Sequence, residues 1–93
     1  MNYDKIPAHM RAAVKLYLER GIPPGSFLMA VLSNDLVGAC MRADRENTAA
    51  MRDWADFMYN EMPGGSWGSK KAVAAWCKSR QEEQITHETE HPQ

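Results

Sequence analysis

Apolar residues recur every three or four positions along most of this chain, which is the spacing of one face of an α-helix. In the first such segment, Val14 and Leu18 fall on a single stripe. Pro7 suits the first helical turn, because its missing N–H has no partner there, and Gly21 suits a helix C-terminus. The pattern predicts a first helix over residues 7–20.

A second apolar stripe follows a Pro-Pro-Gly turn. Ser26 is placed to cap the free N–H groups of a new helix, and Leu32 and Leu36 lie on its apolar face. We expect one helix that loosens near Gly38 or ends by about residue 43. It would bury Leu36 in the core.

Two further helices complete the predicted fold. A polar turn follows, in which Asp44 or Thr48 is placed to cap a third helix. A stripe through Trp54 and Met58 then predicts that helix, which stops before Pro63. Ser69 is the expected cap of a fourth helix. Phe57 and Tyr59 lie off the third stripe and are, with Trp67, candidates for contact with another chain.

The predicted architecture is an all-α, small single-domain bundle of three to four helices over residues 1–81. Residues 82–93 form a polar C-terminal tail with Ile85 as its one strongly apolar residue, and we expect this tail to be disordered. The expected core centres on Val14, Leu28, Leu32, Leu36, Trp54, Met58, Val73 and Trp76.

Composition narrows the possible functions. The formal net charge is −1, whereas general nucleic-acid binders normally carry a basic face. No stretch is long and apolar enough for a membrane span, and the first residues lack the plan of a secretion signal. Cys40 and Cys77 read as reduced core thiols, although a single disulfide stays possible, and a cytoplasmic location in the host cell is expected.

Enzymatic and metal chemistry have little support in the sequence. His87-Glu88-Thr89-Glu90-His91 matches the HExxH pattern, but it lies in the polar tail without a third ligand. No GxSxG motif is present, and His9 is the only histidine outside the tail. We therefore expect a non-enzymatic protein with no metal and no cofactor.

Two helix starts are the strongest candidate binding features. Gly25-Ser26-Phe27 and Trp67-Gly68-Ser69-Lys70 each place a glycine and a serine before a helix, with an aromatic residue beside them. Helix N-termini attract anions, glycine permits close approach, and Lys70 adds positive charge. The alternative is that each serine only caps a helix.

Polar residues elsewhere extend the predicted site. Asn34 and Asp35 interrupt the second apolar stripe, and a carboxylate at such a position needs a partner, which could be an arginine such as Arg42 or Arg52, a helix end or a ligand. Arg45 lies in the polar turn that precedes the third helix and is a further ligand candidate. Turn chemistry alone would also explain Arg45.

Several strings of the chain also resemble small accessory proteins of tailed bacteriophages and prophages. They are Tyr17-x3-Gly21-x2-Pro24-Gly25-Ser26-Phe27-Leu28, Ala30-Val31-Leu32-x-Asn34-Asp35-Leu36, Ala43-Asp44-x2-Asn47, Tyr59-Asn60-x2-Pro63, Trp67-Gly68-Ser69 and Trp76. The resemblance covers about residues 10–80. It implies a viral protein inside a bacterial cell and carries no established activity with it.

In that setting two functions are expected. The chain could sequester a small nucleotide signal of a host defence system, with phosphate and base contacts from the two helix starts. Alternatively, it could inhibit a host defence protein by binding it, as anti-CRISPR proteins do. Seven methionines and eight aromatic residues exceed what one small core needs, which favours a homo-oligomer.

Overall fold

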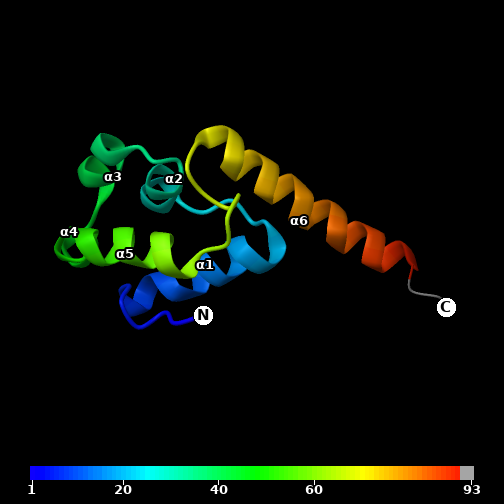
Figure 1. The fold of residues 1–93 in the computed structure, drawn as a ribbon, viewed down its shortest axis with the longest axis horizontal. Helices are drawn as coiled ribbons and strands as arrows, with labels where there is room; N and C mark the ends of the chain where they lie inside the picture. The colour runs from blue at the N-terminus through cyan, green and yellow to red at the C-terminus, as the bar shows by residue number, and fades with distance from the viewer. Residues whose placement is uncertain (91–93) are drawn as a thin grey trace.

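The protein is built from helices alone in the part of the chain that the structure describes, which is residues 1–90, with backbone only from residue 85 onward. This computed structural model contains six helices over that range (Figure 1). They are α1 (Ala8–Arg20), α2 (Ser26–Leu32), α3 (Leu36–Arg42), α4 (Arg45–Ala49), α5 (Met51–Glu61) and α6 (Lys70–Glu90). The all-α prediction is confirmed, but each of the two middle helices that we expected is divided in two.

The first helix agrees with its prediction. α1 ends at Gly21, whose φ of 68° is left-handed; the Gly21 amide donates to the Tyr17 carbonyl and the Ile22 amide to the Leu16 carbonyl. α1 packs against α6, and a β-carbon at Gly21 would lie 2.5 Å from the carbonyl oxygen of Cys77. Glycine is therefore needed here both for its conformation and for the close approach of α6.

The predicted second helix is interrupted between α2 and α3. Asn34 adopts a left-handed φ of 62°, and the amides of Asn34 and Asp35 donate to the carbonyls of Val31 and Ala30. This is a Schellman turn, a common way to end a helix. Asp35 then begins α3, because its Oδ1 accepts a hydrogen bond from the Gly38 amide at 2.9 Å.

The predicted third helix is also divided. Asp44 caps α4 by accepting from the Asn47 amide at 2.7 Å, which confirms one of its two expected caps. The chain bends at Ala50 before α5 begins. Asn47 is buried, and its Oδ1 accepts a hydrogen bond from Trp54 Nε1 at 3.0 Å, so α4 and α5 are joined through a polar pair inside the core.

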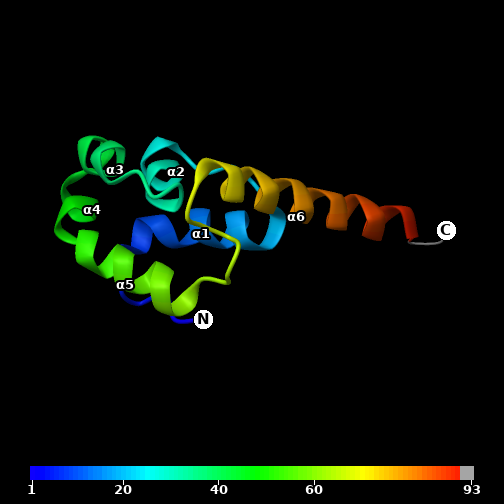
Figure 2. The same cartoon turned by 45° about the horizontal axis from the view of Figure 1, so that its top comes forward.

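The last helix begins as predicted and ends later. Ser69 Oγ accepts from the Ala72 amide at 3.0 Å, which is a helix cap. α6 continues through Glu90, so residues 82–90 are helical where we expected a disordered tail, and residues 91–93 lie outside the described range. Ion pairs one turn apart, Lys78–Glu82 and Arg80–Glu83, support the extension. The second half of α6 runs away from the other helices (Figure 2).

The core gathers side chains from α1, α2, α5 and the first half of α6. Five of the eight predicted core residues are buried, namely Val14, Leu28, Leu32, Trp54 and Val73, while Met58 and Trp76 are partly buried against them. Leu36 is 70% exposed, so its assignment to the core was wrong. Phe57 is buried against Trp54, which rules it out as the exposed contact that we expected.

The two thiols differ in their surroundings. Cys77 is buried and Cys40 is exposed, and no disulfide joins them in the described chain. The prediction of a core thiol therefore holds for Cys77 and fails for Cys40. Desolvation by burial raises the pKa of the Cys77 thiol, which keeps it protonated.

Candidate functional site

Three of the predicted ligand-binding residues meet beside the start of α6. Ser26, Asp35 and Lys70 line a depression of about 200 Å³ together with Arg42, which we call the polar depression. Ser33 lies in its wall, and its buried Oγ has no hydrogen-bond partner among the described residues. The folded chain thus brings two hydroxyls, a carboxylate and two cations to one place from α2, α3 and the start of α6.

Gly38 allows the side chains of Asp35 and Arg42 to come close to each other. A β-carbon at Gly38 would lie 2.1 Å from Asp35 Oδ2 and 2.7 Å from Arg42 Nη1, so both side chains pack across its α-carbon. Arg42 Nη1 also donates to the Gly38 carbonyl at 3.1 Å. No Asp35–Arg42 ion pair occurs among the described residues. Arg42 and the Asp35 carboxylate therefore lie near each other at the edge of the depression.

A second depression, of about 250 Å³, lies on the other side of Ser26 and Arg42. Gly25, Phe27 and Asp44 contribute to its lining. The Asn47 amide hydrogen bond is the main cause of the lowered pKa of Asp44, with a smaller contribution from His9, whose Nε2 lies 2.9 Å from Asp44 Oδ2. A carboxylate that stays charged at this rim disfavours a second anion in the same depression.

Other predicted site residues have different surroundings. Phe27 is only 8% exposed and packs edge-on against Trp54, with ring centroids 5.7 Å apart, so its ring face is not open for base stacking. The Gly68 amide donates to the Leu32 carbonyl at 2.7 Å and is not free for an anion. Asn34 and Arg45 are exposed, Trp67 is partly buried, and none of these three lines the polar depression.

The most exposed apolar surface lies on α3. Leu36, Val37 and Met41 are 70%, 73% and 80% exposed, and Cys40 is exposed beside them. At about 100° per residue these four side chains occupy one continuous arc of the helix. The opposite side carries Gly38 and Ala39, which are buried. We call the outward arc the α3 apolar face.

An apolar pocket of about 140 Å³ adjoins this face. It is lined by Val31, Asn34, Asp35, Leu36, Ala39, Met51, Trp54, Ala55 and Met58, and we call it the methionine pocket. An apolar cavity of about 150 Å³ can hold a benzene-sized group, so this pocket fits one leucine or aromatic side chain. Methionines at its rim can adapt to the shape of whatever enters.

Sequence reasoning did not identify the α3 apolar face, because it placed Leu36 in the core. The available signal was Asn34-Asp35, a pair typical of a helix stop followed by a helix cap. Read that way, the pair would have moved Leu36 to the first turn of a new helix. Arg42 was considered only as a partner for Asp35.

Comparison of the chain with protein-family models, with curated protein sequences and with solved structures gave no match. No helix in the described part is long and apolar enough to cross a membrane. Within the same part, no group of three or more histidine, cysteine, aspartate or glutamate side chains is arranged to hold a metal ion. His87 and His91 have side chains outside the described set.

Proposed function

We propose that this chain is a non-enzymatic binding protein that contacts a partner protein through the α3 apolar face. The observation that carries the proposal is the exposure of Leu36, Val37 and Met41 on one helix of seven residues. Contiguous exposed apolar groups are unfavourable in water, and in monomeric proteins they commonly mark interaction surfaces.

The methionine pocket defines the chemistry of the partner. Because the pocket accommodates one apolar side chain, the partner would insert a leucine or aromatic anchor between Met51 and Met58. Leu36, Val37 and Met41 would pack around that anchor and exclude water from it. The resemblance to phage accessory proteins makes a host defence protein the expected partner.

A double variant tests this function without disturbing the core. Leu36→Glu places an acid in the first turn of α3, and Met41→Lys places a base in its last turn, so both charges suit the helix dipole. Both positions are largely exposed, and we expect stability to change by less than about 0.5 kcal/mol. Leu16→Lys, at an exposed leucine of α1, is the matched control.

The assay uses bacterial strains that each carry one defence system active against a test phage. Expression of the parent chain or of Leu16→Lys should restore plaque formation in one of these strains, and the double variant should not. Undiminished restoration by the double variant would exclude the α3 apolar face as the contact. Absence of restoration in every strain would contradict the anti-defence setting itself.

The polar depression supports a second candidate function, which is the sequestration of a small nucleotide signal. Lys70, Arg42 and the unpartnered Ser33 hydroxyl offer contacts for one phosphate group, while the Asp35 carboxylate in the same lining opposes it. The depression is smaller than the roughly 300 Å³ of typical ligand pockets, and Phe27 is not open for stacking. For these reasons we rank this function second.

Melting shifts distinguish the second candidate from the first. A panel of cyclic nucleotides and ADP-ribose derivatives is added to the purified chain, and a ligand at 100 times its dissociation constant should add about 2.7 kcal/mol of stability. Lys70→Ala should abolish the shift, whereas the neighbouring Lys71→Ala should retain it. A shift that is equal in both variants, or no shift with any compound, would contradict nucleotide binding at this place.

A further inference from the structure

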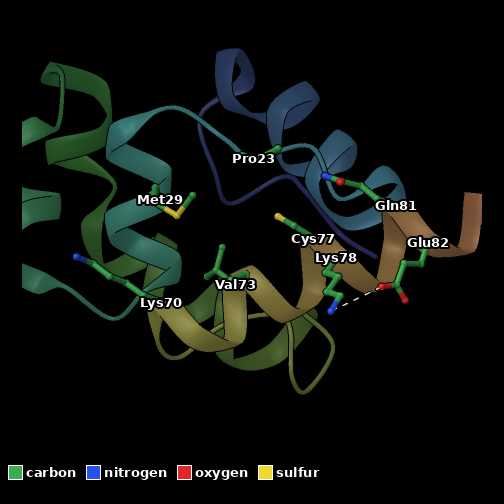
Figure 3. Close-up of a pocket in the computed structure, with 9 residues that line it drawn as sticks. Pro23, Met29, Lys70, Val73, Cys77, Lys78, Gln81 and Glu82 are labelled. Atoms are coloured by element: carbon green, nitrogen blue, oxygen red, sulfur yellow. Dashed lines mark ion pairs between the residues drawn. The ribbon is translucent and has the colours of Figure 1, made fainter. Parts of the chain in front are cut away.

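A large hollow lies between α2 and α6, and it shares only Met29 and Lys70 with the polar depression. It has a volume of about 480 Å³, within the range of small-molecule sites, and we call it the α6 groove. Its lining residues are Pro23, Met29, Lys70, Val73, Ala74, Cys77, Lys78, Gln81 and Glu82. Figure 3 shows Met29, Val73 and Cys77 directed toward a common space.

The groove is elongated because its residues follow one face of α6. Positions 70, 73, 74, 77, 78 and 81 recur at helical spacing, and the distance along the helix from the first to the last is about 16 Å. Met29 of α2 and Pro23 of the preceding loop form the facing wall. An extended ligand fits this shape better than a compact one does.

A charge without an ion-pair partner among the described side chains is present at one end only. Lys78 is paired with Glu82 at 3.9 Å, and Gln81 donates a hydrogen bond to the Gly21 carbonyl at 2.9 Å. Lys70 has no ion-pair partner among the described side chains, and it lies at the opposite end of the groove from Gln81 (Figure 3). The floor between the two ends is aliphatic and sulfur-rich, and no aromatic ring lines it.

We propose that the α6 groove binds a single-chain anionic amphiphile. Its alkyl chain would lie along Met29, Val73 and Cys77, and its carboxylate or phosphate headgroup would pair with Lys70. The absence of an aromatic ring from the lining and the single uncompensated cation make the groove unsuitable for a nucleotide. The proposal is independent of the α3 apolar face, which lies on other residues.

Calorimetric titration with octanoate, decanoate and dodecanoate, each below its micelle concentration, tests the proposal. Affinity should increase about fourfold for each methylene that enters the groove. Dodecyl phosphate in place of dodecanoate distinguishes a phospholipid-like headgroup from a fatty acid. Dodecyltrimethylammonium should bind more weakly than either, because its cationic head repels Lys70.

Two matched pairs of variants locate the binding. Lys70→Glu should weaken dodecanoate about tenfold, since the headgroup contact becomes a repulsion, while Lys71→Glu, one residue away and outside the lining, should bind like the parent. Ala74→Trp fills the groove from an exposed position and should abolish binding, and Ala75→Trp should not.

Melting curves establish that each variant is folded, and if Ala74→Trp does not fold, the two lysine variants decide the question. The proposal is overturned if dodecanoate does not bind the parent. Equal affinity in Lys70→Glu and Lys71→Glu, or equal affinity for the cationic amphiphile, would overturn it as well. None of these results bears on the double variant of α3.

Discussion

Replacement of Gly21 by alanine should weaken the contact between α1 and α6 more than any other glycine substitution in the chain. Two costs add at this position. An alanine at a φ of 68° is disfavoured by about 1–2 kcal/mol, and its β-carbon would lie 2.5 Å from the Cys77 carbonyl oxygen, which is backbone and has to move. Such movement also strains the hydrogen bond from Gln81 to the Gly21 carbonyl.

We expect Gly21→Ala to cost about 2–4 kcal/mol of unfolding free energy, which for a domain of this size is a melting decrease of about 10–25 °C. Two other glycines separate the causes, because no atom lies within 4 Å of a β-carbon at either of them. Gly65 has a φ of 88°, so Gly65→Ala should show the conformational cost alone. Gly64 has no positive φ, and Gly64→Ala should be neutral or slightly stabilising.

Thermal and urea unfolding of the three variants provide the measurement. The expected order of stability is Gly64→Ala, then Gly65→Ala, then Gly21→Ala. Equal losses at Gly21 and Gly65 would refute the argument from close packing, because only the backbone conformation would then matter. A loss below about 1 kcal/mol at Gly21 would show that α6 does not approach α1 as closely as the structure has it.

Three further predictions concern the core, the response to acid and the assembly. Asn47→Ala removes the partner of the buried Trp54 indole and should cost about 1–3 kcal/mol in urea unfolding, and a loss below about 0.5 kcal/mol would make this hydrogen bond irrelevant to stability. The pKa of Asp44 is lowered on folding, so its charge stabilises the protein above the ordinary value of 3.8 and this contribution disappears as the pH falls through the folded pKa. The difference in stability between the parent and Asp44→Asn should therefore be larger near neutral pH than near pH 2, and an unchanged difference would contradict the sign. Light scattering at high micromolar concentration should give a mass above 10.5 kDa if the predicted homo-oligomer forms, and the monomer mass would exclude it.

Local sequence signals identified most helix ends, but Ser26, the expected cap of the second helix, is instead its first residue and makes no capping hydrogen bond. Gly21 and Ser69 are read correctly because a left-handed glycine and a serine cap act within one helical turn and need no tertiary information. Burial of Val14, Leu32 and Trp54 also follows from spacing alone, since each lies on an apolar stripe. These predictions depend on interactions between residues close in sequence.

Long-range contacts decided the features that the sequence did not reveal. Phe57 lies off the apolar stripe of α5 and is nevertheless buried, because Tyr3, more than fifty residues earlier, packs against it. The continuation of α6 past Gln81 is favoured by the hydrogen bond from that side chain to Gly21, sixty residues earlier. A hydropathy pattern read along one helix contains neither contact.

The exposure of the α3 apolar face results from a single backbone turn at Asn34 and Asp35. In a continuous helix, Leu36 would lie about 40° from Leu32 and share its buried stripe. The left-handed conformation of Asn34 ends α2 and redirects the chain, and Asp35 starts α3 in the new direction. Because small residues of α3 face the core, its large apolar residues point outward. Leu36, which we expected in the core, is therefore exposed. Leu36 is exposed while Ala39 is buried, so the interruption of the helix at Asn34 is what creates the α3 apolar face.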